Sequence, residues 1–147
     1  MVIAIIGILA SIVLVNLSGA MTKAKSAAMV SSAESIMQAA LIGATSTNDY
    51  SAYNLNAWIP TSKSCSSLPS AVQSACNSMV ADYPNYPYVM LIGTGGLNNP
   101  NKDLDITVWL PDSTMYCINS SGITYKGPGN YPGKGTYYAP GCWYNIM

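Results

Sequence analysis

The sequence has no histidine, no phenylalanine and little charge, with six basic and six acidic residues among 147. The lack of histidine excludes nucleophiles that an imidazole base activates, and it excludes histidine ligands for a metal. The net charge of zero removes the basic face on which nucleic-acid binding depends. Residues 93–96 (GTGG) lack the lysine and the following helix of a phosphate-binding loop. We therefore expect no enzymatic activity, no cofactor and no nucleic-acid partner.

Residues 1–15 carry no charge and form an almost unbroken apolar run, MVIAIIGILASIVLV, in which Ser11 is the one polar residue. A helix of this composition is apolar on every side, so it must lie in lipid, in the centre of a helix bundle, or in both at different times. It would rise about 22 Å, which is less than the roughly 30 Å hydrocarbon layer of a membrane. A signal peptide cleaved near Ala20 is the main alternative, but no basic residues precede the apolar run.

Proline is absent before Pro60, and small or apolar residues recur at helical spacing from Ala20 to Ala44. One helix is therefore predicted over residues 1–46, with an apolar first half and an amphipathic second half that lies on a head of residues 47–147. Lys23 and Lys25 are the first charged residues of the chain. In a membrane segment whose N-terminus faces the cytoplasm they would lie outside, against the usual charge bias of membrane proteins.

The remainder of the chain changes from loop-like to strand-like composition. Residues 46–85 are rich in Ser, Asn, Tyr and Pro, and within them a short helix is predicted over residues 68–80. A compact apolar run then predicts a strand over residues 88–92, and alternating apolar residues predict one over 105–110. Two further strands are predicted over residues 115–118 and 123–125, joined by a hairpin turn. The order predicts an α+β fold in which a long N-terminal helix packs on an antiparallel sheet.

The cysteines, Cys65, Cys76, Cys117 and Cys142, all lie in the predicted head. An even number confined to one region indicates disulfides and an oxidising compartment. Sequential pairing, Cys65 with Cys76 and Cys117 with Cys142, is preferred because each bond then closes a local segment. Pairing of Cys65 with Cys142 stays open. A Cys117–Cys142 bond would tie the irregular tail, rich in Gly, Pro and Tyr, to the sheet.

Two further sites are considered on the head. Oxygen-bearing residues alternate in one run, which a loop could wrap around calcium: Asn99, Asn101, Asp103 and Asp105. The alternative is a solvated turn, since Asn and Asp also favour turns. Asn119 matches the glycosylation acceptor rule and lies in the predicted hairpin turn.

Two segments carry a resemblance to a known family. Residues 3–12 (IAIIGILASI) resemble the N-terminal helix of type IV pilins and pseudopilins, and residues 116–122 (YCINSSG) resemble a strand and turn of many pilin-like heads. The resemblance implies the type IV pilin fold. Mature chains of this family begin with a phenylalanine, a few apolar residues and a glutamate that docks subunits. Matching Gly7 to the family's glycine places the leader, the processing site, the phenylalanine and that glutamate before Met1. We expect them to be encoded upstream of Met1, and their genuine absence is the alternative.

The resemblance also implies a function, that of a structural subunit of an extracellular type IV pilus. Such a subunit lies in the cytoplasmic (inner) membrane before assembly, and its partners are copies of itself, a prepilin peptidase and the pilus assembly machinery. The filament has functions such as cell adhesion. A pseudopilin of a type II secretion system and a membrane-anchored binding or adhesion module are the alternatives. The residues expected in the filament core are Ile3, Ile5, Ile6, Gly7, Ile8, Leu9 and Ile12.

Overall fold

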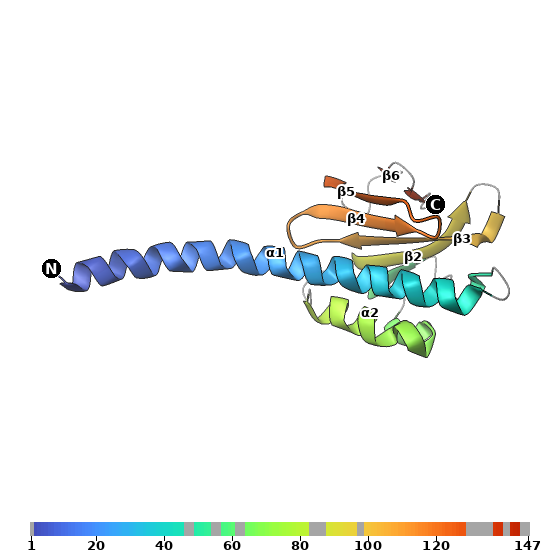
Figure 1. The fold of residues 1–147 in the computed structure, drawn as a ribbon, viewed down its shortest axis with the longest axis horizontal. Helices are drawn as coiled ribbons and strands as arrows, with labels where there is room; N and C mark the ends of the chain where they lie inside the picture. Colours follow the sequence, from blue (N-terminus) through green and yellow to red (C-terminus); the bar gives the residue numbers. More distant parts are fainter. Residues whose placement is uncertain are drawn as a thin grey trace.

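One helix, α1 (Val2–Ala44), dominates the computed structural model and extends far beyond the rest of the molecule at its N-terminal end (Figure 1). The structure describes residues 2–45, 49–53, 57–60, 64–82, 88–96, 99–128, 137–139 and 142–144. The second half of α1 lies on a head that contains a further helix and an antiparallel sheet, so the fold is α+β. In Figure 1, α1 runs between the sheet and the second helix, and it contacts both.

The continuity of α1 follows from its composition. It contains no proline, and its two glycines in the projecting half, Gly7 and Gly19, each cost only about 1 kcal/mol relative to alanine. Ser11 and Thr22 donate hydrogen bonds to the carbonyl oxygens of Gly7 (2.8 Å) and Ser18 (3.1 Å), so their hydroxyls are satisfied within the helix. The helix expected over residues 1–46 thus runs from Val2 to Ala44.

The side of α1 that faces the head is buried at regular helical spacing. These side chains are at most 2 % exposed: Ser26, Met29, Ala33, Ile36, Met37, Ala40 and Ala44. Ser26 is the first buried side chain among those that the structure describes. The contact between α1 and the head therefore begins at Ser26, and the part of α1 before it projects.

The second helix, α2 (Ser70–Asp82), lies two residues further along the chain than predicted. Before it, Ser64 caps a short 3-10 turn, η2 (Cys65–Ser67), by accepting a hydrogen bond from the Ser66 backbone N–H. Leu68 then adopts an extended conformation, as residues before a proline usually do, and this delays the start of α2. A second 3-10 turn, η1 (Ser51–Tyr53), follows α1.

The Cys65–Cys76 disulfide joins η2 to α2 across a Cα–Cα distance of 5.7 Å, which is the pairing preferred from the sequence. Closing a ring of this size is worth about 3 kcal/mol in the chain-entropy model. Cys117, on the sheet, is also disulfide-bonded. The side chain of Cys142 lies outside the described part, so the Cys117–Cys142 pairing stays a prediction.

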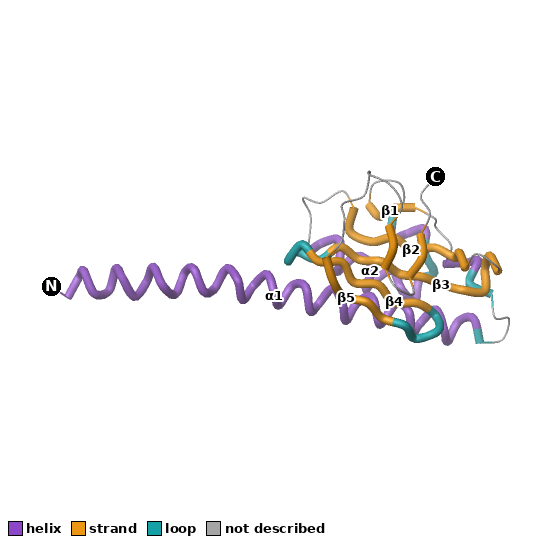
Figure 2. The backbone as a smooth tube through the Cα atoms, turned by 90° about the horizontal axis from the view of Figure 1, so that it is seen from above, coloured by secondary structure: helices purple, strands orange, loops and turns teal. Residues whose placement is uncertain are grey.

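The sheet has five antiparallel strands in sequence order: β1 (Ala57–Pro60), β2 (Tyr88–Gly96), β3 (Asn99–Trp109), β4 (Thr114–Asn119) and β5 (Thr124–Pro128). Strands β2 to β5 include most of the residues predicted as strand. β1 was predicted as loop, because it is only four residues long and ends in proline. In Figure 2 the strands cross over α1 and α2.

The tail, predicted to be irregular, contains a small two-stranded sheet of β6 (Tyr137–Ala139) and β7 (Cys142–Tyr144). β7 contacts β2, β3 and β4. β6 lies on the side of the main sheet away from α1 (Figure 1). The middle strands β3 and β4 are thus covered on both faces, by α1 on one and by this hairpin on the other.

Both faces of β3 are consequently buried. Leu104, Ile106 and Val108 face the core that α1 completes, and each is 0 % exposed. The residues between them, Asp105 and Thr107, are buried on the other face. Strand β4 joins the same core through Tyr116, which lies opposite Val108 and donates a hydrogen bond to Glu34 Oε1 (3.0 Å) on α1. Burial, and then this contact with Glu34, raise the pKa of Tyr116 to about 12.

Candidate functional site

The projecting half of α1 is the most unusual surface of the molecule. Ile3, Ile5 and Ile6 are 87 %, 59 % and 60 % exposed, and Gly7 is exposed beside them. The side chains of the other residues predicted for the filament core, Ile8, Leu9 and Ile12, lie outside the described part. Leaving an isoleucine in water instead of burying it costs roughly 1.5–3 kcal/mol. A row of such residues therefore favours a partner or a lipid environment.

The exposed apolar character continues to the edge of the head. Leu17 and Met21 are each 54 % exposed and, with Ser18, Thr22 and Lys25, line a shallow depression on α1. Lys23 is exposed beside it. We call residues 17–25 the junction. The sequence prediction ended the apolar run at Val15 and missed this part, although Leu17 and Met21 continue its spacing.

Among the described residues, one helical stretch, Leu17–Ala44, is long and apolar enough to cross a membrane by length and composition alone. A third of its apolar 18-residue window is buried inside the molecule. Core helices of soluble proteins and signal sequences meet the same criterion, so the stretch is only weak support for a membrane anchor.

The residues predicted to bind calcium lie in strand β3, so the loop conformation expected for them is wrong. Alternate residues of a strand are about 6.8 Å apart, so the run from Asn99 to Asp105 spans about 20 Å. Calcium ligands must lie at about 2.3–2.6 Å from one ion, which an extended strand cannot achieve with these residues. Within the described part there is no group of three or more Asp, Glu, Cys or His residues that could hold a metal.

Asp105, from that run, is a buried acid. Its side chain is 7 % exposed on the outer face of the sheet, opposite Gly93 of β2 and Asn119 of β4. Burial raises its pKa to about 7, and the nearby charge of Asp103 adds to the shift. The sequence predicted the strand over residues 105–110 but not the burial of both its faces. Trp109 and Cys117, which lie on the same face as Asp105, were the sequence signal for this burial, since both residue types are often buried.

The predicted glycosylation acceptor, Asn119, takes part in the β4–β5 turn. Its Oδ1 accepts hydrogen bonds from the backbone N–H groups of Ser121 (3.1 Å) and Ile123 (2.8 Å). Gly122 completes the turn with a φ of 82°, a conformation that favours glycine. The Asn119 amide is therefore held by the fold, and its role as a sugar acceptor stays a prediction.

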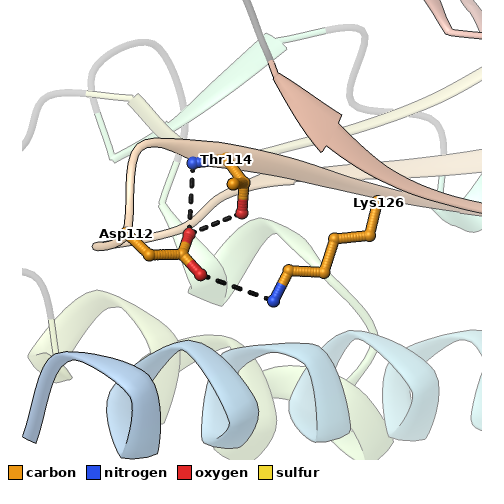
Figure 3. A network of polar contacts seen from close by, with 3 residues as sticks. All are labelled: Asp112, Thr114 and Lys126. Atoms are coloured by element: carbon orange, nitrogen blue, oxygen red, sulfur yellow. Dashed lines mark hydrogen bonds and ion pairs between the residues drawn. The ribbon is translucent and has the colours of Figure 1, made fainter. Parts of the chain in front are cut away.

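A polar network closes the turn between β3 and β4 (Figure 3). Asp112 accepts hydrogen bonds from the backbone N–H and the hydroxyl of Thr114, and its other oxygen lies 3.4 Å from Lys126 Nζ. Partial burial acts to raise the pKa of Asp112, but the bonds from Thr114 and the charge of Lys126 outweigh it and lower the pKa. The network is well suited to hold the turn, where Ser113 has a φ of 63°.

The geometry thus offers one extended apolar surface on α1 and a head whose polar clusters serve its own turns and strands. No protein-family model, no curated protein and no solved structure matches the chain. The functional argument therefore depends on the surface of α1.

Proposed function

We propose that this chain is a structural subunit of a type IV pilus, with the type IV pilin fold, and that it polymerises through the projecting half of α1. The observation that carries the proposal is the exposure of Ile3, Ile5 and Ile6 on a helix that extends beyond its own head. The α+β fold with an N-terminal apolar helix on an antiparallel sheet is compatible with it.

The physical basis of the proposal is an exchange of environments. Before assembly the projecting half lies in the cytoplasmic membrane, and in the filament it lies among the equivalent helices of other copies. Lipid tails and neighbouring apolar helices are similar surroundings for isoleucine, so close packing can decide between them. Small residues such as Gly7 and Ser11 allow such close approach. Repeated head-to-tail contacts that do not close into a ring then produce a helical polymer.

The proposal is tested by shearing cells that make the protein and examining the sheared fraction for fibres. Wild-type chains are expected in long surface fibres. Ile6→Glu places a charge in the contact between helices, so it is expected to abolish the fibres. Ile123→Glu, at an isoleucine that is 46 % exposed on the head, is the matched control and should leave them intact.

If the wild-type protein occurs only in the membrane fraction, the filament is excluded, and the chain is better described as a membrane-anchored binding or adhesion module. Short fibres that appear only when a secretion apparatus is overproduced would indicate a pseudopilin instead.

A further inference from the structure

The two lysines of the junction are not accounted for by polymerisation. Lys23 and Lys25 are the only charged side chains among the first 33 residues, and both are exposed. They lie immediately before Ser26, where α1 first contacts the head. Any membrane that surrounds the projecting half would therefore meet these two positive charges at its surface.

The surroundings of the lysines combine apolar and polar groups. Lys25 lies at one end of the depression that Leu17, Ser18, Met21 and Thr22 also line. Leu17 and Met21 present apolar side chains, and Ser18 and Thr22 each follow one of them directly along the helix. This pattern matches an amphiphile, whose chain contacts the apolar residues and whose head group lies beside the lysines.

The distribution of charge along the chain favours a negative partner. All the acidic residues of the sequence occur at Glu34 or later, so no acid of α1 lies within two turns of Lys25. The charged side chains of residues 1–33 are thus all positive.

The distances along α1 agree with a membrane surface. If Val15 marks the end of the hydrocarbon layer, Lys23 lies about 12 Å further along the helix axis. The headgroup layer is about 5–8 Å thick on each side of the hydrocarbon. A lysine stem extends far enough to bring its ammonium group back to that layer.

We propose that the junction binds the headgroups of anionic phospholipids and so seats the head on the membrane surface. The inference rests on the membrane-inserted state in the proposed function. It also gives a role to lysines on the side of the membrane where positive charge is usually disfavoured. Each lysine near an anionic surface favours binding by about 5-fold, and the two together by about 30-fold.

The test follows the full chain as it is diluted from detergent into a mixture of two vesicle populations. One population is phosphatidylcholine alone, and the other also contains phosphatidylglycerol. The ratio of protein on the two populations, separated by flotation, is the measured quantity. At low salt we expect a preference of up to about 30-fold for the anionic vesicles, and near 1 M salt, where screening acts within about 3 Å, a ratio close to one.

Substitutions of the two lysines test whether they cause the preference for anionic vesicles. Lys23→Gln with Lys25→Gln should remove most of the preference, whereas Lys23→Arg with Lys25→Arg should keep it. Lys126→Gln, a lysine of the head, is the matched control and should leave the ratio unchanged. A preference that survives the double glutamine change would overturn the inference.

The remaining outcomes separate this inference from the proposed function. Equal amounts of wild-type protein on both populations would overturn headgroup binding and leave membrane insertion standing. Protein on neither population would overturn the membrane-inserted state itself, and headgroup binding with it.

Discussion

Asp105 is the residue whose chemistry is most altered by the fold. It is buried on the sheet face that the β6–β7 hairpin covers, and neither strand of that hairpin contributes a lysine or arginine. Strands β2 and β4, on either side of it, contribute none either. A buried acid without a cation on these neighbouring strands is stable mainly in its protonated form.

This environment predicts a pH dependence of stability. Because the pKa of Asp105 rises from 3.8 to about 7 on folding, the folded state binds the proton more tightly. The contribution of protonated Asp105 to the free energy of unfolding is complete below about pH 4 and is lost as the pH rises through 7. Asp105→Asn should flatten this slope and stabilise the protein at pH 8 by a few kcal/mol at most, as measured by urea unfolding in detergent at pH 4.5 and 8.

Asp49→Asn provides the control for this experiment. Asp49 is exposed and accepts a hydrogen bond from the Ser51 backbone N–H (2.8 Å), which asparagine can also accept. The control should therefore keep the wild-type slope. An Asp105→Asn variant with that same slope would show that Asp105 does not titrate near neutral pH.

At the scale of elements, the contact between α1 and the head depends on one row of side chains. Ile36 is 0 % exposed in this row, whereas Ile42, on the same helix, is 73 % exposed. Ile36→Ala should lower the free energy of unfolding by about 2–5 kcal/mol through the cavity that it leaves. Ile42→Ala should change it by about 0.5 kcal/mol or less. Equal losses in urea unfolding would mean that α1 packs on the head through a different face.

The elements also show where sequence reasoning succeeds. Long periodic segments such as α1 and β3 could be predicted because burial on one face repeats at a fixed spacing. β1 and the β6–β7 hairpin could not, because they are three or four residues long and their pairing depends on residues far away in the sequence. The loop expected around Asn99 to Asp105 is a strand for a similar reason, since pairing with β2 and β4 extends a segment whose composition favours turns.

The candidate surface was only partly predictable. The apolar run identifies the projecting half of α1, because composition alone determines that its side chains need a partner. The position of the junction depends on where α1 first contacts the head. Ser26 marks that point only through contacts made by the folded chain.

At the scale of the whole molecule, the head and the projecting half are separable. Residues 1–21 include none of the described buried side chains, so their deletion should leave the head folded. We expect the shortened protein to be monomeric without detergent, with a Tm within about 5 °C of the full chain, because the packed core is unchanged. Size-exclusion chromatography and calorimetry would measure both.

The matched comparison extends the deletion to residue 37. That change also removes Met29, Ile36 and Met37 from the core, so the head should unfold. If instead the shorter deletion unfolds the head, the projecting half contributes to its stability, and the two parts cannot be treated as independent.

The continuity of α1 through both parts has a mechanical consequence. No loop or hinge interrupts the helix between the apolar side chains at its start and the buried row from Met29 to Ala44. A pull on the projecting half is therefore transmitted along hydrogen-bonded backbone directly into the head. In the head, the buried side chains of α1 resist this force together, in shear. The load is therefore shared among many contacts rather than concentrated on one.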